Sequence, residues 1–317
     1  MSTNNIVIYF LIIVAGLVII SCTKTYVGRV AYEISEKDLI PEGITYSSTT
    51  NSFYLSSIHK TKIIRIEAET GDVSDFITSD LVGMNFLGLI TDDTRNNLWA
   101  CCNRGNNSAV VKFNLQTGEL INSYSISDNT ENLFNDLILD KKGNTYFTNT
   151  NQQTIYRIDQ QTDSLTIFFD ENEIIHPNGI TISPDDKYLY IASNEKGIRI
   201  MDIISRKIIN EPDNTNTSTG IDGLKYYKNS LIGIQNEVKS RSDMKIAKYY
   251  LNRNGTKITK RTIIDQNGPH FDIPTTFVIR NNNLYCLANS QLANIDSNNK
   301  IRSYEALDDI IILKYDL

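Results

Sequence analysis

Short alternating runs of apolar and polar residues, bounded by turn residues, fill most of the chain after residue 40. In the stretch HPNGITISPDDKYLYIAS, residues 176–193, a strand at 180–183 and a strand at 188–193 flank a turn, which predicts an antiparallel hairpin. The first strand opens on Asn178 and Gly179. A polar amide followed by glycine is a poor start for a buried strand, unless the amide has a function or the backbone needs room.

The same arrangement recurs six times. Each copy contains a short strand, a polar turn, an aromatic-bearing second strand, a third strand often of the form Ile-x-Arg-Ile or Val-x-Phe, and a further turn into a fourth. The copies begin at Pro41, Phe86, Phe134, Pro177, Ile221 and Pro274. A period of roughly 40–50 residues with four strands per unit is typical of a propeller blade, whereas a β-sandwich would not repeat such a unit six times. The sequence therefore predicts an all-β, six-bladed β-propeller.

The segments that flank the six copies fit the closure of such a ring. Residues 22–34 are expected to form a tether and a possible ring-closing strand, and residues 35–317 the propeller itself. Either end can supply a strand to the last blade, and the sequence leaves open which end provides the outermost one.

The first strand of every propeller blade lines the central channel, so equivalent positions from different blades converge on one axis. The residues that open these strands are Glu42, Leu87, Asn135, Asn178, Asp222 and Thr275. Two unpartnered carboxylates repel each other, and a bound divalent cation removes that repulsion. Oxygen donors without imidazole or thiolate favour Ca²⁺ over Zn²⁺. We therefore expect Glu42, Asn135, Asn178 and Asp222 to bind a metal; the alternative is that these residues cap strands or hold channel water.

Four stretches carry a resemblance to a known family: PEGITYSSTTNSFYLSSI, LFNDLILDKKGNTYFTN, HPNGITISPDDKYLYIAS and GIDGLK. From about residue 40 to the end, the chain resembles the gluconolactonase and regucalcin (senescence marker protein) family of six-bladed propellers, which also looks like the paraoxonases. The resemblance implies that Glu42, Asn178 and Asp222 bind one divalent cation, Ca²⁺ or another such as Mn²⁺ or Zn²⁺. It also implies that Asn135 lies beside the metal and the substrate, with Asp136 as the next residue.

The resemblance further implies hydrolysis of a lactone or ester, with Asp222 as the candidate general base. A cation at the channel mouth would polarise the carbonyl, hold a water molecule and stabilise the oxyanion. Two departures from the family pattern are present. Leu133 stands where an arginine tends to precede the Phe-Asn-Asp motif in members that hydrolyse sugar lactones, and Glu-Gly-Ile replaces Glu-Gly-Pro. The first departure argues against a sugar-acid lactone as the substrate.

Two histidines precede first strands, on loops that enter the channel from the side of the expected metal. His176 and His270 stand before the fourth and sixth blades, where either could act as a general base or contact substrate; the alternative is that both are merely solvated. His59 lies between the second and third strands of its blade. Because the sequence contains no nucleophile elbow, phosphate loop or zinc helix, serine hydrolase, nucleotide-binding and metalloprotease functions have no support.

Composition and charge narrow the possible partners. Of the 317 residues, 40% are hydrophobic and 21% charged, as in an ordinary globular protein. A net charge of −6 argues against nucleic acid as a partner, because no basic stripe offsets the carboxylates. Cys101, Cys102 and Cys286 lack zinc-binding spacing and are expected to be small, unbridged core residues.

The beginning of the chain predicts export. The apolar run from Ile6 to Ile20 matches the hydrophobic region of a signal peptide, residues 1–21, better than a spanning helix, which needs about 20 residues. The ending IISC resembles a bacterial lipobox, so Cys22 would be lipidated and would tether the protein to the cell envelope, facing the periplasm or the exterior. The alternative is an uncleaved anchor helix.

Together these features predict a lipid-anchored, monomeric enzyme that hydrolyses a small-molecule lactone or ester with the help of a divalent cation. One alternative is a non-catalytic propeller that binds a protein or glycan and uses the metal only for structure. Another is an envelope scaffold without a metal. An enzyme needs a pocket where Asn135, Asp222 and a histidine converge, whereas a binding protein would show a broad aromatic patch on one face.

Overall fold

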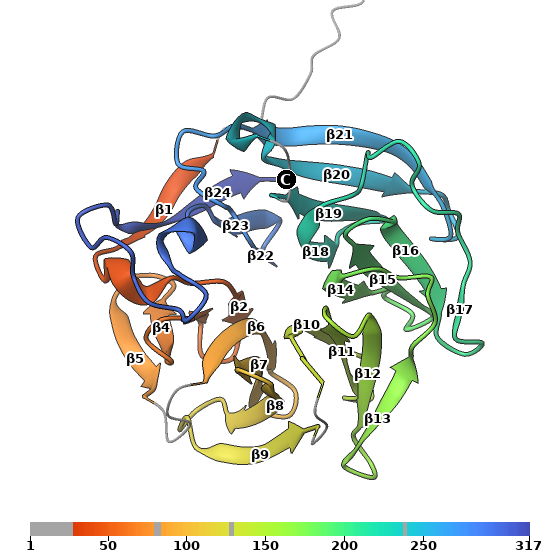
Figure 1. The fold of residues 1–317 in the computed structure, drawn as a ribbon, viewed down its shortest axis with the longest axis horizontal. Helices are drawn as coiled ribbons and strands as arrows, with labels where there is room; N and C mark the ends of the chain where they lie inside the picture. The colour runs from red at the N-terminus through yellow and green to blue at the C-terminus, as the bar shows by residue number, and fades with distance from the viewer. Residues whose placement is uncertain (1–27, 79–83, 127–129, 237–239) are drawn as a thin grey trace, which may run out of the picture.

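Six antiparallel sheets stand around a central channel as the blades of a propeller (Figure 1). The computed structural model describes residues 28–78, 84–126, 130–236 and 240–317, and each sheet in these residues has four strands. The six-bladed, all-β architecture predicted from the repeat is confirmed. Helical structure in the described residues is limited to three short 3₁₀ helices, η1 (Lys37–Leu39), η2 (Arg241–Asp243) and η3 (Leu292–Asn294).

From the channel outward, the first three blades follow the chain order. They consist of β2 (Ile44–Ser47), β3 (Ser52–Ser56), β4 (Ile63–Glu67) and β5 (Val73–Ile77); β6 (Asn85–Asp92), β7 (Asn97–Arg104), β8 (Asn107–Asn114) and β9 (Leu120–Ser125); and β10 (Phe134–Leu139), β11 (Thr145–Asn149), β12 (Thr154–Asp159) and β13 (Ser164–Phe169). The next two consist of β14 (Pro177–Ile182), β15 (Tyr188–Ser193), β16 (Gly197–Asp202) and β17 (Lys207–Ile208); and β18 (Ile221–Tyr226), β19 (Ser230–Gln235), β20 (Lys245–Leu251) and β21 (Ile258–Gln266).

The sixth blade joins the two ends of the chain. Its order from the channel outward is β22 (Phe277–Arg280), β23 (Asn283–Leu287), β24 (Ile310–Asp316) and β1 (Arg29–Ile34). The outermost strand therefore comes from the N-terminal side, and its antiparallel pairing with β24 closes the ring, as the red and blue strands in Figure 1 show.

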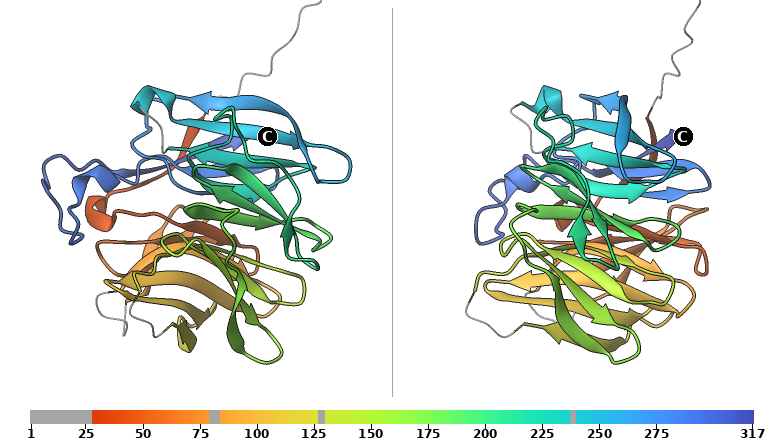
Figure 2. Two further views of the ribbon diagram at one scale, coloured as in Figure 1. Left: turned by 45° about the vertical axis from the view of Figure 1, so that its right-hand side comes forward. Right: turned by 90° about the vertical axis from the view of Figure 1, so that its right-hand side faces the viewer.

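The sixth blade also departs from the repeat. In the other blades the third strand follows the second after nine residues or fewer, but here residues 288–309 intervene between β23 and β24. We call this segment, which contains η3, the blade-6 insertion. The blue insertion projects from one face of the disc (Figure 2).

The direction of the strands defines the two faces of the propeller. Each blade has four antiparallel strands, so all six inner strands begin at the same face, and the connections between blades lie there too. The loops between second and third strands lie at this mouth face as well, and they include the blade-6 insertion. The turns between first and second strands, and between third and fourth strands, lie at the opposite face.

The hydrophobic core is divided among the gaps between blades. Six clusters of buried apolar residues occur in the described chain, one in each gap. Every residue of β3 and β19 is buried, because middle strands are covered on both faces by neighbouring blades. Cys101 and Cys102 in β7 and Cys286 in β23 are buried and unbridged, as the sequence predicts.

No helix in the described ranges is long and apolar enough to cross a membrane. The apolar run from Ile6 to Ile20 and the expected lipidation site Cys22 lie outside the described residues.

Glycines let the inner strands approach one another around the channel. A methyl group at Gly43 would lie 2.2 Å from the carbonyl oxygen of Leu87 in the next blade, and one at Gly179 would lie 2.2 Å from the carbonyl oxygen of Asp222. Both separations are far shorter than a van der Waals contact. The backbone next to the ring residues therefore requires glycine because of packing between blades.

We expect the Gly179→Ala variant to lose about 3 kcal/mol of unfolding free energy, because the added methyl group meets backbone atoms that no side-chain rotation can move. Urea denaturation measures the loss. The matched control is Gly105→Ala, where a methyl group meets nothing within 4 Å and only the left-handed backbone, φ 56°, costs about 1 kcal/mol. Equal losses in the two variants would show that the close approach does not limit packing.

Candidate functional site at the channel mouth

The six residues that open the inner strands are held out of regular strand pairing. In the second to fifth blades, the register between the first two strands is interrupted at residues 87–88, 135–136, 178–179 and 222–223. In the first and sixth blades, Glu42 and Thr275 precede the inner strand by two residues. Such bulges re-aim side chains and are common beside active sites. We call Glu42, Leu87, Asn135, Asn178, Asp222 and Thr275 the mouth ring.

The polar residues of the mouth ring are largely withdrawn from solvent. Glu42, Asn135 and Asp222 are buried, and Asn178 is half-buried. Glu42 Oε2 and Asn135 Oδ1 are buried oxygen atoms without a hydrogen-bond partner in the described part of the chain. A buried acceptor without a partner costs free energy, so these two atoms form a place where a cation or a donor would be favourable.

Side chains from neighbouring strands orient the ring. Asn236, just after β19, donates from Nδ2 to Asp222 Oδ2 at 2.6 Å and to the Pro274 carbonyl at 2.9 Å. Asn135 Nδ2 donates to Thr150 Oγ1 at 3.1 Å, and that hydroxyl donates to the Pro177 carbonyl at 2.7 Å. These contacts leave the side-chain amide oxygen of Asn135, Oδ1, available to a ligand.

A buried ion pair lies beside the ring. Lys225 Nζ in β18 donates to Asp136 Oδ2 in β10 at 3.2 Å, and the Asp136 side chain is only 4% exposed. Asp136 Oδ2 also accepts from Ile180 N at 3.2 Å, and its Oδ1 accepts from Leu137 N at 2.9 Å. Asp136, which the resemblance placed near the substrate, thus ties the third, fourth and fifth blades together.

The carboxylates of the site act on one another. Burial raises the pKa of the Glu42 carboxyl well above its ordinary value, and the charges of Asp222 and Asp136 raise it further, whereas the Lys225 ammonium lowers it. Like charges brought together out of water disfavour ionisation. The site therefore favours a cation or a proton at Glu42.

The donors that could hold a cation are oxygens of mixed type. No group of three or more His, Cys, Asp or Glu side chains suited to a metal occurs among the residues that the structure describes. Any cation at the ring would therefore need the amide oxygens of Asn135 and Asn178 beside the carboxylates of Glu42 and Asp222. Such a set suits Ca²⁺, which accepts carboxylates, amide carbonyls and water.

The two candidate histidines lie at the surface of the mouth face. His176 is 49% exposed in its side chain, and its Nδ1 lies 3.5 Å from Glu195 Oε1. His270 is exposed in the connection between the fifth and sixth blades. The structure thus brings Glu42, Asn135, Asn178 and Asp222 to one ring and leaves both histidines outside its buried part.

Sequence reasoning missed Lys225, Asn236 and Thr150. Lys225 lies three residues after Asp222 on a channel-lining strand, which was the available signal. Thr150 and Asn236 each directly follow the second strand of their blade, where that strand ends at the mouth face. This position could have been aligned across the repeats.

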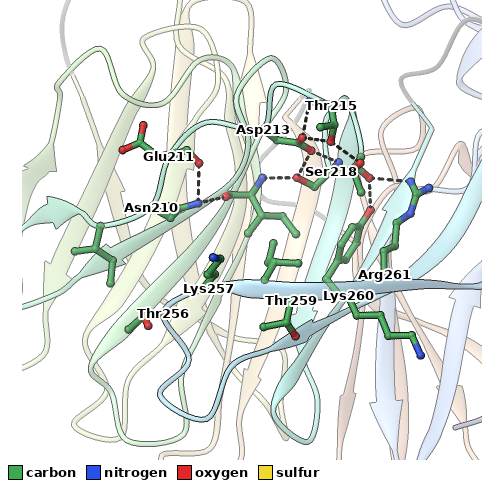
Figure 3. Close-up of a pocket in the computed structure, with 15 residues that line it drawn as sticks. Asn210, Glu211, Asp213, Thr215, Ser218, Thr256, Lys257, Thr259, Lys260 and Arg261 are labelled. Atoms are coloured by element: carbon green, nitrogen blue, oxygen red, sulfur yellow. Dashed lines mark hydrogen bonds between the residues drawn. The ribbon is translucent and has the colours of Figure 1, made fainter.

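A separate pocket of about 560 Å³ lies at the outer edge between the fourth and fifth blades (Figure 3). Its polar groups largely satisfy one another: Asp213 Oδ1 accepts from Thr215 N at 2.9 Å, and Arg261 Nη1 donates to the Thr217 carbonyl at 3.1 Å. None of its lining residues belongs to the mouth ring. The pocket is therefore distinct from the channel site.

The fold and the ring define a class of protein: a six-bladed propeller with an acidic, oxygen-lined channel mouth. The family model described as the SMP-30/gluconolactonase/LRE-like region matches residues 40–224, which include every residue of the mouth ring except Thr275. The chain belongs to this family. Among curated proteins, none matches the sequence.

Solved structures share the fold at low sequence identity. The major allergen Mala s 1 of Malassezia sympodialis has a TM-score of 0.67 at 16% identity, over 90% of this chain and 95% of that one. Virginiamycin B lyase from Staphylococcus aureus has a TM-score of 0.64 at 17% identity, over 92% and 99%. A gluconolactonase from Xanthomonas campestris has a TM-score of 0.58 at 13% identity, over 87% and 86%. At these identities the likeness establishes the fold alone.

The raised pKa of Glu42 predicts a pH dependence of stability in the presence of a chelator. A carboxyl with a raised folded-state pKa stabilises the fold fully below its ordinary value, 4.5, and loses that contribution as pH rises through the folded-state pKa. We therefore expect Glu42→Gln to be more stable than the native protein at pH 8 and to lose this advantage near pH 4. Urea denaturation at several pH values measures the difference.

The matched control is Glu171→Gln, which neutralises an exposed carboxylate outside the site. Its stability should follow that of the native protein at each pH. A native protein that is more stable than Glu42→Gln at pH 8 would contradict the electrostatic account of the ring.

Proposed function

We propose that the protein is a hydrolase of lactones or related esters that depends on a divalent cation, Ca²⁺ in the first place. The observation that carries the proposal is the pair of buried, unpartnered oxygens, Glu42 Oε2 and Asn135 Oδ1, at a ring that also holds the carboxylate of Asp222. Membership of the SMP-30/gluconolactonase/LRE-like family supports the same reaction class.

The proposed cation ligands are Glu42, Asn135, Asn178 and Asp222. The bound cation would polarise the carbonyl of the substrate and stabilise the oxyanion that forms on attack by water. Asn236 holds Asp222 through Oδ2 and so fixes the plane of the carboxylate. Asp136 is already satisfied by Lys225 and two backbone donors, which makes it a support for the ring rather than a proton acceptor.

Proton transfer in the proposed reaction begins at Asp222, the candidate general base. Water attacks the carbonyl carbon while the carboxylate accepts its proton. The bond from that carbon to the ring oxygen of the lactone then breaks, and the alkoxide takes a proton, which gives a hydroxy acid. His176 or His270 could deliver that proton only by moving inward from the surface, so Asp222 is the favoured carrier.

A surface suited to a protein partner is less evident. Tyr304 is the one exposed large aromatic side chain among the described residues, so they show no broad aromatic patch. This favours the enzyme over a non-catalytic binding protein.

The location at the cell envelope is a further part of the proposal. It is supported by the apolar run from Ile6 to Ile20 and by the lipobox-like ending at Cys22. A lipid at Cys22 would leave few residues between the membrane and β1, which begins at Arg29, so the propeller would stay close to the lipid surface.

We expect the full-length protein to hydrolyse members of a small lactone and aryl-ester panel with Ca²⁺, Mn²⁺ or Zn²⁺ and to lose activity in a chelator. Asp222→Asn should lower kcat/KM at least 100-fold, since it removes a carboxylate ligand and the base. It should also abolish the rise in Tm on addition of Ca²⁺. Spectrophotometric turnover and thermal unfolding measure the two effects.

Glu171→Gln is the control for this experiment and should behave as the native protein does. A rise in Tm with Ca²⁺ that persists in Asp222→Asn would remove the ring from the proposal. If Ca²⁺ stabilises the native protein but no substrate of the panel is turned over, the metal is structural and the binding alternative replaces the enzyme.

The anchor has its own test. We expect the native protein in the membrane fraction of cells and the Cys22→Ser variant in the soluble fraction, because serine offers no thiol for lipidation. Cell fractionation and mass spectrometry of the N-terminus measure this. Retention of the unprocessed variant in the membrane to the same extent as the native protein would instead favour an anchor helix.

A further inference from the structure

The blade-6 insertion is anchored across the mouth face of the first blade. The buried side chain of Gln291 donates from Nε2 to the Asp308 carbonyl at 3.0 Å and accepts on Oε1 from Asp308 N at 2.8 Å, which closes the two ends of the loop. At its tip, the Asn299 carbonyl lies 2.8 Å from His59 Nδ1 on the loop between β3 and β4. The insertion is thus fixed at both its base and its tip.

The underside of this insertion is apolar and continuous with the mouth ring. Leu292, Ile295 and Ile301 are partly buried and pack against a cluster that contains Leu307 of the insertion. The same cluster contains Ile40 and Ile58 of the first blade and Leu87 of the mouth ring, and Leu133 before the third blade also packs against it. Apolar packing therefore links the insertion to Leu87 of the ring.

The channel mouth consequently has polar positions and one apolar position, which the insertion adjoins through the shared cluster. Carboxylate and amide oxygens come from Glu42, Asn135, Asn178 and Asp222, whereas the second-blade position of the ring is Leu87. Three side chains of the insertion remain only partly covered, so part of their apolar surface is still open. A ligand whose reacting group meets the oxygens would meet this apolar surface with the rest of its body.

We infer that the blade-6 insertion is the wall that selects the substrate, and that the substrate carries a hydrocarbon or aromatic substituent rather than a set of hydroxyl groups. This inference rests on the proposed hydrolysis and names the substrate class for that site. Hydroxyl groups placed against Leu87, Leu292 and Ile295 would lose their hydrogen bonds to water without new partners. A methylene chain in the same place would gain from removal of its surface from water.

The test uses the full-length protein with γ-lactones of increasing alkyl chain, from butyrolactone to nonalactone, beside glucono-δ-lactone. Matching γ-lactams, which resist hydrolysis, report binding by calorimetry independently of turnover. We expect kcat/KM and lactam affinity to rise about fourfold per added methylene. In Ile295→Asn the increase per methylene should fall below twofold, because the amide replaces the apolar surface that the chain would contact.

The matched control is Ile204→Asn, since Ile204 is 90% exposed in a turn at the opposite face and should leave the chain-length dependence unchanged. Ile301→Asn is a second wall variant, used if Ile295→Asn has a lowered Tm. The inference is overturned if kcat/KM and lactam affinity still rise with chain length in both wall variants. It is also overturned if they do not rise with chain length in the native protein.

The two proposals fail separately. If lactams bind more tightly as the chain lengthens but no lactone is turned over, the inference about the insertion stands and the proposed hydrolysis is wrong. If lactones are turned over without any preference for longer chains, or with a preference for glucono-δ-lactone, the proposed hydrolysis stands and the inference about the insertion is wrong.

Discussion

The close approach of six inner strands around the axis is the constraint on which the rest of the molecule depends. Gly43 and Gly179 let their strands meet the backbone of the next blade. At the joint between the last and first blades, the hydroxyls of Thr275 and Thr276 donate to the Glu42 carbonyl at 2.8 and 2.7 Å. The contacts around the ring therefore continue from the sixth blade, which joins the two ends of the chain, to the first blade. Without this approach, the opening residues of different blades would not share one site.

The same approach has an electrostatic cost. It forces Glu42, Asp136 and Asp222 together in a place that water does not reach freely, and it leaves Glu42 Oε2 without a partner among the described residues. Lys225 offsets part of this cost through Asp136, but one ammonium does not balance three carboxylates. Packing between the blades stabilises the propeller enough to hold this arrangement. Concentrated strain of this kind is expected where a protein binds a ligand, since a fold selected only for stability would relieve it.

The features that recur in every copy of the repeat could be predicted from the sequence. Six copies of one pattern were enough to give the six blades, the free cysteines and the set of residues that meet at the channel. The repeat could not show Lys225 reaching Asp136, because 89 residues separate the pair and the contact crosses the channel. Nor could it show which end forms the outermost strand, because both ends offer apolar segments. In the sixth blade the repeat predicts a third strand soon after the second, but the residues that follow, QLANIDSNNKI, form η3 and a loop, and the third strand is β24.

The place where the sixth blade departs from the repeat is the blade-6 insertion, which distinguishes the mouth face of this propeller. The repeated part of each blade must satisfy the same packing on both faces, so it tolerates little change beyond the residues of the ring. A loop at the mouth face has no such neighbour and can lengthen without disturbing the blades. The blade-6 insertion does so, and its Leu292 and Ile295 join the cluster of Leu87. In the function that we propose, the repeat supplies the oxygens of the mouth ring, and the blade-6 insertion supplies the apolar surface that selects the substrate.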